Sequence, residues 1–429
     1  MRDKMILGEN AEFSTDSEVT GVNNNVIVCA GSGCGKTLSI MDPRLLNTYD
    51  SSLIVTVTKR RLVHQYTQMF KNRGYKVLDL NFVKPQSSNV TFDPLHYIKS
   101  YTDITFLAES IVKANPRKEY TTADPFWDDN STSLLSALIA YVMGESKSST
   151  FDDVIELFTQ MKIEESGTGI KTNLDSKLDK SNTFAYNRWR SFRSLPMKTA
   201  SCVFSTLSTT LDMMFTPELR KIMRSQTTVN FENIAKEKTV LFVTTSAVNP
   251  ALNLFVNMFY AQAIKQLFEI GENMPDGKLP IPVSILCDDF ATGSRILNFP
   301  EYISIFREKG ISVTLLVQSE SQLVSIYGAE NATTIINNCD TYVYMGGMDI
   351  KTARNISERI NLPLEDVMYM PVGDVMIFRR GQRPIMTTRY DIYHDREFIA
   401  VKEAYDHSVK IMDDLLKKAA SAQIPTSSK

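Results

Sequence analysis

The chain has 429 residues, of which 43% are hydrophobic and 22% charged. At about 150 residues per domain it is long enough for two to three domains with a large buried core. Its 47 lysines and arginines against 49 aspartates and glutamates give a formal net charge of −2. These figures exclude a disordered chain and a globally basic coat for nucleic acid, so any contact with DNA needs a local patch.

The cysteines and the apolar runs indicate the compartment. Five cysteines occur with no CxxC pair, and the first residues lack the apolar stretch of a signal peptide. The longest apolar window, 134–143, is about half of the roughly 20 residues that cross a bilayer. We expect a reducing, cytoplasmic protein with no disulfide framework, no structural zinc site and no membrane span of its own.

Short apolar runs are the main structural pattern along the chain. A β-branched run at 25–29 enters a glycine cluster at 30–37, and the later runs are 53–57, 76–80, 239–244, 283–287, 313–317, 341–345 and 375–378. They are near-continuous, which is typical of strands buried on both faces of a parallel sheet. Helical patterns separate several of them, at 62–70, 252–268, 302–307 and 351–360. The alternation predicts a doubly wound α/β domain.

Between about 99 and 225 the apolar residues recur at helical spacing instead, which predicts an all-helical insertion punctuated by polar loops. The tail from 405 predicts a helix that ends in Ser/Thr-rich sequence. We therefore divide the chain into two parts of one α/β domain, an all-α domain, and a C-terminal helix and tail. Their bounds are 1–98 and 226–400 for the α/β parts, 99–225 for the all-α domain, and 401–429 for the tail.

The glycine cluster AGSGCGKT fits the Walker A pattern, except for Ala30 where Gly is usual. Its glycines let successive backbone N–H groups wrap an anion, and the helix that follows adds its N-terminal dipole. Lys36 would neutralise the β- and γ-phosphates, and Thr37 would place its hydroxyl on Mg²⁺. The alternative is a glycine-rich turn in a βα unit, which rarely carries Lys-Thr in this register. The predicted ATP contacts are Gly31, Ser32, Gly33, Cys34, Gly35, Lys36 and Thr37.

A second strand ends in two carboxylates, Asp288 and Asp289. A P-loop enzyme needs an acid at such a strand end to hold Mg²⁺, and a group to orient the attacking water. Asp288 is the predicted Mg²⁺ partner, and Asp289 stands where many such ATPases carry Glu as general base. Asp is one methylene shorter, which puts the rate of hydrolysis in question. The alternative is an Asp pair that caps a helix.

Two further candidates follow downstream. Gln318 closes the apolar run 313–317, which in this fold class puts its amide at the crevice beside the nucleotide, where it would sense the γ-phosphate or align water. Arg307 precedes that run and is a candidate arginine finger for a neighbouring subunit's nucleotide. The alternatives are a helix cap for Gln318 and a plain surface arginine for Arg307.

Several segments in this order resemble a known family, the coupling proteins of type IV secretion, which are hexameric ATPases of conjugation and related secretion systems. The segments are Asn23-Asn-Asn-Val26 before the glycine cluster, Asp124-Pro-Phe-Trp127-Asp, Cys287-Asp-Asp-Phe290, Arg307-Glu-Lys-Gly-Ile311, Val317-Gln-Ser-Glu-Ser-Gln-Leu323 with Tyr327-Gly328, Asn338-Cys-Asp340 and Tyr344-Met-Gly346. Together they span most of residues 20–395.

The resemblance implies a RecA-like P-loop nucleotide-binding domain with an inserted all-α domain. It implies ATP and Mg²⁺ as ligands, with the proposed roles passing to Lys36, Thr37, Asp288, Asp289, Arg307 and Gln318. It also implies partners: the secretion machinery, a relaxase-bound DNA strand, expected to be single-stranded, or protein effectors, and further copies of the chain in a hexamer. ATP turnover would be coupled to delivery of the substrate into the secretion channel.

The sequence departs from the family pattern in three places. Thr56-Val57-Thr58-Lys59 stands where members usually show Asp, and Phe92-Asp93-Pro94 stands where they often show Asn-Pro. Most members also carry an N-terminal anchor of two membrane helices. We expect either a variant without that anchor or a cytosolic fragment, brought to the inner face of the membrane by a partner.

Residues 171–198 are a candidate surface for substrate. Seven Lys/Arg against two acids, interleaved with Phe184, Tyr186, Trp189 and Phe192, suit single-stranded DNA or an acidic partner. However, Tyr186, Trp189 and Phe192 also share one helix stripe, which is more often core, and the charges also fit a solvated face. Phe126-Trp127 is read as a packing anchor of the helical domain rather than a binding site.

Three functions remain open from the sequence. The first is an ATP-hydrolysing coupling motor, and the second is a related RecA-like DNA translocase. The third is an adaptor that binds ATP to recruit substrate and turns it over slowly. The absence of helicase motifs and the Phe126-Trp127 segment favour the first over the second.

Overall fold

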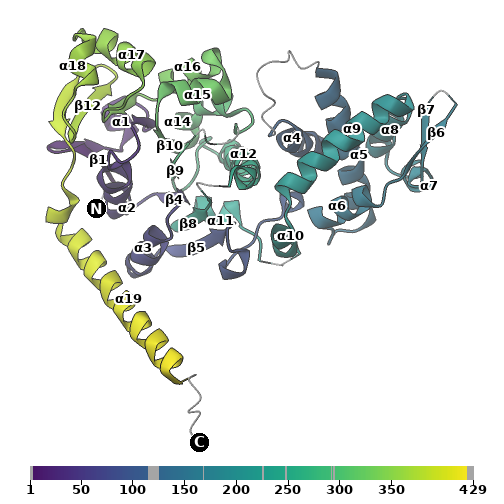
Figure 1. Cartoon of the computed structure of the whole chain (residues 1–429), viewed down its shortest axis with the longest axis horizontal. Helices are drawn as coiled ribbons and strands as arrows, with labels where there is room; N and C mark the ends of the chain where they lie inside the picture. The colour runs from purple at the N-terminus through teal and green to yellow at the C-terminus, as the bar shows by residue number, and fades with distance from the viewer. Residues whose placement is uncertain are drawn as a thin grey trace, which may run out of the picture.

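A computed structural model describes residues 3–114, 125–167, 169–224, 227–246, 249–290, 292 and 295–422. A twisted sheet with helices on both faces forms one part of the molecule, and a group of helices forms the other (Figure 1). The C-terminal helix α19 (Arg396–Ala422) runs outward from the sheet side and begins five residues before the boundary proposed at 401.

Within the described residues, nine strands form the main sheet in the order β13-β12-β11-β3-β10-β9-β4-β8-β5. The seven strands from β11 to β5 in this order run parallel, while β12 and β13 pair antiparallel at one edge. The strands are β3 (Val26–Cys29), β4 (Ser52–Val57), β5 (Lys76–Asn81), β8 (Thr239–Thr244), β9 (Val283–Cys287), β10 (Ile311–Val317), β11 (Thr341–Tyr344), β12 (Asp374–Arg379) and β13 (Ile385–Thr388). The predicted α/β class with a mainly parallel sheet is confirmed.

The inner parallel strands are mostly apolar because both faces of the sheet are covered, whereas the edge strand β5 also carries Lys76 and Asp79. In β3, Val26 and Val28 join one hydrophobic cluster, and Ile27 and Cys29 join the other. The first cluster includes side chains of α2 (Asp42–Leu46), α3 (Arg61–Asn72) and the start of α19. The second includes α12 (Pro250–Glu272), α15 (Glu320–Tyr327), α16 (Ala329–Asn337) and α17 (Ile350–Ile360). Consecutive side chains of a strand point to opposite faces, so a doubly covered strand reads as a continuous apolar run.

Helices α4 to α10 gather at the other end of the molecule (Figure 1). They are α4 (Tyr101–Val112), α5 (Pro125–Glu145), α6 (Phe151–Thr159), α7 (Asp175–Leu178), α8 (Thr183–Arg193), α9 (Met197–Met214) and α10 (Pro217–Met223). The expectation of an all-α insertion is wrong in one detail, because β6 (Ile163–Ser166) and β7 (Gly169–Thr172) form an antiparallel hairpin. Gly167, directly after β6, has a positive φ of 54°, which favours glycine. The bounds 99–225 stay our proposal for this domain.

Three strands and one helix break depart from the sequence reading. The hairpin of β1 (Lys4–Gly8) and β2 (Ala11–Ser14) and the edge strand β13 were not predicted, since each is short and only partly buried. The predicted helix 302–307 is instead two short helices, α13 (Phe299–Ile303) and α14 (Phe306–Lys309). Across the described ranges, no helix is both long and apolar enough to cross a membrane.

Candidate functional site

Four adjacent parallel strands end side by side, so their carboxyl ends lie together on one side of the sheet. The strand order β3-β10-β9-β4 puts the glycine-rich loop after β3 beside Gln318 after β10, followed by the Asp288-Asp289 pair after β9. These segments line one cavity of about 660 Å³, together with Thr58 and Lys59 after β4. Crevices at the carboxyl ends of parallel strands are the usual ligand sites of this fold class.

The backbone of the glycine-rich loop is held by its neighbours in the sheet. The N–H of Ala30 donates to the carbonyl of Val317 at 3.1 Å, and that of Gly31 donates to Gly346 at 2.9 Å. Gly33 and Gly35 adopt φ values of 80° and 82°, which favour glycine. The loop therefore keeps a conformation that most side chains would strain, as a cradle of backbone N–H groups requires.

The lysine and threonine of the motif follow at the loop's end. The Lys36 ammonium donates to the carbonyls of Ala30 at 2.6 Å and Gly31 at 3.2 Å, and the residue is only 9% exposed. Thr37 begins a π-helical turn, Thr37–Met41, which leads directly into α2. A π-helical turn is rare and is frequent at functional sites. The charge and the hydroxyl that the sequence assigned to phosphate and Mg²⁺ thus lie on the same cavity wall.

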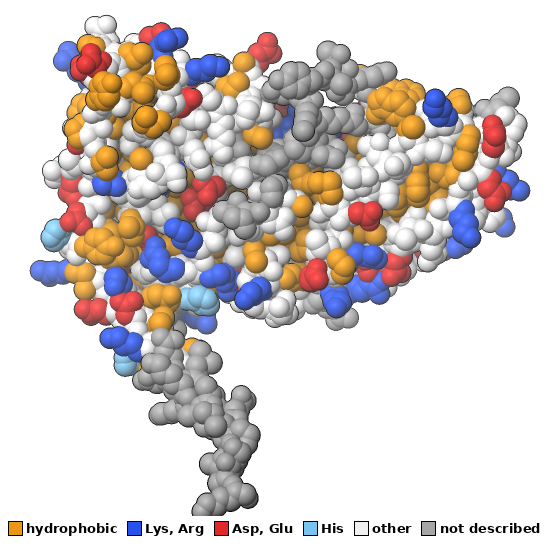
Figure 2. Space-filling model, viewed as in Figure 1, with side chains coloured by type: hydrophobic (Ala, Val, Ile, Leu, Met, Phe, Trp, Pro, Cys, Tyr) orange, Lys and Arg blue, Asp and Glu red, His pale blue; other side chains and the backbone are white. Residues whose placement is uncertain are grey.

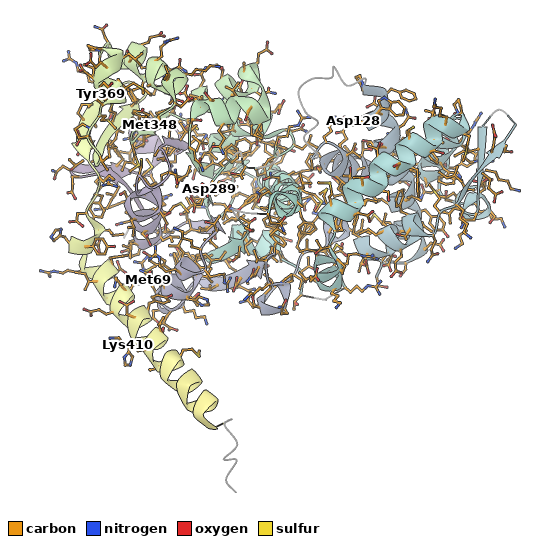
Figure 3. All side chains as sticks on the ribbon, in the orientation of Figure 1. Met69, Asp128, Asp289, Met348, Tyr369 and Lys410 are labelled. Carbon is orange, nitrogen blue, oxygen red and sulfur yellow. The ribbon has the colours of Figure 1, made fainter. Side chains whose placement is uncertain are left out.

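The two carboxylates differ in environment. Burial raises the pKa of the Asp288 carboxyl to about 6, and the neighbouring Asp289 carboxylate adds to the rise. The ammonium groups of Lys36 and Lys59 act in the opposite direction. Asp289 has a φ of 53°, an uncommon value outside glycine. Strained backbone of this kind clusters at functional sites, and at Asp289 it occurs just after β9 ends. Figure 3 shows Asp289 near the middle of the molecule.

The structure places Gln318 at the cavity and Arg307 away from it. The Gln318 residue is exposed on the cavity, and its backbone N–H donates to the Gln322 side-chain oxygen at 3.1 Å. Arg307 lies in α14, directly before β10. It therefore lies where the parallel strands begin, on the side of the sheet opposite the cavity. Its guanidinium donates to the carbonyls of Gly21 at 3.2 Å and Ser17 at 3.3 Å. Within one chain, the structure brings Arg307 to the end of a short helix and not to the glycine-rich loop.

Other lining residues were not found from the sequence. Arg61 of α3 and three residues of the C-terminal segment share the same cavity: Tyr393, Phe398 and Lys402. Arg389 also reaches the loop and donates to the Cys34 carbonyl at 2.9 Å. More than 350 residues separate Arg389 from the loop, so no local motif links them. Lys59, two residues after β4, also lines the cavity, although the sequence indicated it only as part of a segment that departs from the family pattern.

The basic stretch 171–198 gives a mixed result. Trp189 and Phe192 are buried in the core of the helical part, and the Trp189 indole donates to Asp175 at 3.2 Å. Phe184 stacks on Tyr101 with ring centroids 4.7 Å apart. Trp189 and Phe192 are therefore core residues and not a stacking surface for bases, whereas the Phe184–Tyr101 pair is only partly buried, since Tyr101 is 54% exposed.

The charges of this stretch lie outside that core. Arg193 pairs with Asp179 at 2.8 Å, while Lys177 and Arg190 are exposed. On the face seen in Figure 2, basic and acidic side chains are interspersed rather than gathered in one field. Trp127 packs against the core as expected of an anchor, whereas Phe126 is 38% exposed, and Asp124 of that segment lies outside the described residues.

A strand, a glycine loop ending in Lys-Thr, and an adjacent strand ending in acids define the class of P-loop nucleotide-binding proteins with a RecA-like sheet. Residues 2–361 match the family described as "Type IV secretory system Conjugative DNA transfer". Because this match covers most of the chain, the protein belongs to that family.

Relatives agree with the assignment. The type IV secretion system-coupling proteins VirD4 of Bartonella quintana and Bartonella henselae are each 23% identical over 88% and 89% of the chain. The chain spans 64% of the length of each.

Among solved structures, the conjugative coupling protein TrwB with sulphate gives a TM-score of 0.68 at 16% identity, covering 91% of this chain and 90% of TrwB. TrwB with ADP and Mg²⁺ gives the same values. VirB4 of Thermoanaerobacter pseudethanolicus gives a TM-score of 0.54 at 13% identity, covering 91% of this chain and 96% of VirB4. At these identities the likeness shows the fold.

Proposed function

We propose that this chain is an ATP-hydrolysing coupling protein of a type IV secretion or conjugation system. It recruits DNA-relaxase or protein substrates and couples ATP turnover to their transfer. The observation that carries the proposal is the shared cavity, which brings the glycine-rich loop, both strand-end carboxylates and Gln318 together in a member of this family. TrwB structures with ADP and Mg²⁺ and with an ATP analogue give it further support.

The loop and its lysine would hold the nucleotide. The backbone N–H groups of the turn bind phosphate oxygens, and the Lys36 ammonium, already held against the loop, neutralises charge on the β- and γ-phosphates. Asp289 accepts a proton from the attacking water, and the Gln318 amide aligns that water. The products are ADP and inorganic phosphate.

The residues present also fit Mg²⁺. Thr37 offers a hydroxyl and Asp288 a carboxylate on one cavity, and hard oxygen donors suit this ion together with phosphate oxygens. The described residues hold no cluster of three or more His, Cys, Asp or Glu, which agrees with a metal held largely by its substrate. Thr37 and Asp288 would hold the ion, and bound Mg²⁺ would supply positive charge that offsets the negative charge of the phosphates.

Assembly and partners complete the proposal. A role for Arg307 requires a neighbouring copy, since its own glycine-rich loop lies at the other edge of the sheet. We propose a homo-oligomer, a hexamer by family resemblance, that works with the secretion machinery and a single DNA strand. The same resemblance supports action at the inner face of the membrane through a partner.

Phosphate release tests the proposed function. Wild type, Lys36→Ala and the exposed control Lys84→Ala are compared at increasing protein concentration, with and without single-stranded DNA. We expect turnover that rises with assembly, is abolished in Lys36→Ala and is unchanged in Lys84→Ala. Equal rates in wild type and Lys36→Ala would contradict the motor and leave the slowly turning adaptor.

Subunit mixing tests the finger. If Arg307 acts on a neighbour's nucleotide, mixing Arg307→Ala with Lys36→Ala subunits restores part of the activity that each variant lacks alone. If no ratio restores activity, Arg307 does not act on a neighbour's nucleotide, and its hydrogen bonds to Ser17 and Gly21 are its role.

A further inference from the structure

The wall of the nucleotide cavity formed by the C-terminal segment carries two aromatic rings, which differ in exposure. Phe398, in the first turns of α19, is 1% exposed and belongs to the hydrophobic core. Tyr393 lies in the short 3₁₀ turn η4 (Ile392–His394) and is 55% exposed, although it lines the same cavity as the glycine-rich loop. A large aromatic side chain left half in water at a ligand cavity is a candidate contact for an apolar, flat group.

The Tyr393 ring is held in place from below. Ile392, its neighbour in the turn, is buried in the core, and the Asp391 carboxylate accepts the Tyr393 backbone N–H at 3.0 Å. Phe398 meets the tyrosine ring edge to face, with centroids 5.6 Å apart and an interplanar angle of 81°. An edge-to-face contact covers at most one face of the tyrosine ring, so another face stays available for stacking.

The segment is also tied to the phosphate end of the cavity. The Arg389 side chain donates to the Cys34 carbonyl within the glycine-rich loop, and its backbone N–H donates to Gly373 at 2.7 Å. Tyr393 follows Arg389 by only four residues. The ring therefore stands on a segment whose start contacts the loop.

The chemistry of a nucleotide matches this arrangement. Its phosphates suit the backbone N–H groups and Lys36, and its base is a flat aromatic group that stacks on tyrosine. A cavity of about 660 Å³ falls in the ordinary size range of cofactor sites. The exposed ring would otherwise be a contact for another protein, and the test below separates the two.

We propose that Tyr393 is the platform on which the base of the bound nucleotide stacks, with the phosphates in the glycine-rich loop. This rests on the proposed function, because it assigns the second half of the same ligand. Stacking tolerates every base, so Tyr393 contributes affinity for ATP and GTP alike.

The test compares a ligand with a base and one without. Equilibrium dissociation constants for Mg²⁺-ATP, Mg²⁺-GTP and Mg²⁺-tripolyphosphate are measured with wild type, Tyr393→Ala and Tyr393→Phe. Tyr369→Ala serves as the control, since Tyr369 is 78% exposed and lies well away from Asp289 in Figure 3. Lys36→Ala is measured beside them.

In Tyr393→Ala we expect about tenfold weaker binding of ATP and GTP and unchanged binding of tripolyphosphate. Tyr393→Phe and Tyr369→Ala should bind all three ligands as wild type does. ATP binding by Tyr393→Ala within twofold of wild type, or an equal loss of tripolyphosphate binding, would overturn the platform. If Lys36→Ala leaves all three ligands unaffected, the proposed function itself fails; if it weakens all three, a negative result at Tyr393 concerns the platform alone.

Discussion

The glycine-rich loop and the basic stretch 171–198 both suggested ligand contacts, but they are built differently. The loop is a backbone structure, fixed by hydrogen bonds from Ala30 to Val317 of β10 and from Gly31 to Gly346, just after β11. The charged side chains of the basic stretch lie on the surface of helices, and the aromatic residues Trp189 and Phe192 of the same stretch are buried in the core. Changes at the loop should therefore alter ligand binding, whereas changes at the aromatic residues of the stretch should alter stability first.

The largest expected effect belongs to Trp189→Ala. Removing this fully buried indole should lower the free energy of unfolding by about 3–5 kcal/mol. The exposed neighbour Arg190→Ala should change it by less than about 0.5 kcal/mol. Denaturant unfolding measures both. A Trp189→Ala protein of wild-type stability that loses DNA binding would restore the indole as a ligand contact.

Gly35→Ala tests the loop itself. Alanine at a φ of 82° is strained, and its Cβ would come within 2.8 Å of the Arg389 side chain. We expect about 30-fold weaker ATP binding, equivalent to about 2 kcal/mol. Gly74→Ala has nearly the same φ, 79°, in open space, so it controls for strain alone. Calorimetric titration should show no change in ATP affinity for Gly74→Ala, and a similar loss in both variants would refute the local explanation.

Asp93 connects the sheet part of the molecule to the helical part, and the free energy of unfolding should depend on pH through its carboxyl. Its carboxylate accepts the backbone N–H groups of Leu95 at 3.0 Å and of Phe151, in the helical part, at 3.1 Å. Burial raises the pKa of this carboxyl to about 7. The folded chain therefore keeps a proton that the unfolded chain loses above about pH 4, and the free energy of unfolding falls as pH rises from 4 to 7.

Asp93→Asn removes that titration and keeps an oxygen acceptor. At pH 8 the variant should exceed wild type in free energy of unfolding by about 1–2 kcal/mol, and the advantage should vanish near pH 4. Urea unfolding at several pH values measures it. A difference that stays constant across this range would mean that Asp93 does not hold a proton in the folded protein.

The smallest effect concerns the exposed charges of the basic stretch. Replacing Lys177, Lys180 and Arg190 together by glutamine should weaken binding of single-stranded DNA by a few-fold and reduce its salt dependence by about two ion equivalents. Fluorescence anisotropy at several salt concentrations measures this. An unchanged affinity and slope would leave these residues as a solvated face.

The sequence predicted the sheet and the loop for physical reasons. Buried parallel strands are continuous apolar runs, as at 239–244 and 283–287, and the structure gives those two strands the same bounds. The glycine-rich motif consists of consecutive residues, so its spacing can be read directly from the sequence. That Arg307 lies at the far edge of the sheet also follows from its position before β10, because the site lies where parallel strands end.

The remaining features depend on distant contacts. Tyr393 and Lys402 reach the cavity only because the C-terminal segment folds back across the edge of the sheet, and no local spacing encodes that. The hairpin of β6 and β7 was hidden by the helical periodicity on either side of it. The exposure of Trp189 could not be read from a stripe that fits both core and surface.

Single-turnover hydrolysis by Asp289→Asn tests the central claim most directly. Asparagine tolerates the positive φ at this position and keeps the size of the side chain, so ATP affinity should equal that of wild type. Without a base to accept the proton of the attacking water, phosphate release from preformed enzyme–ATP complex should slow at least about 100-fold. A rate equal to that of wild type, at equal ATP occupancy, would contradict the assignment of this cavity as the hydrolytic site built on Asp289.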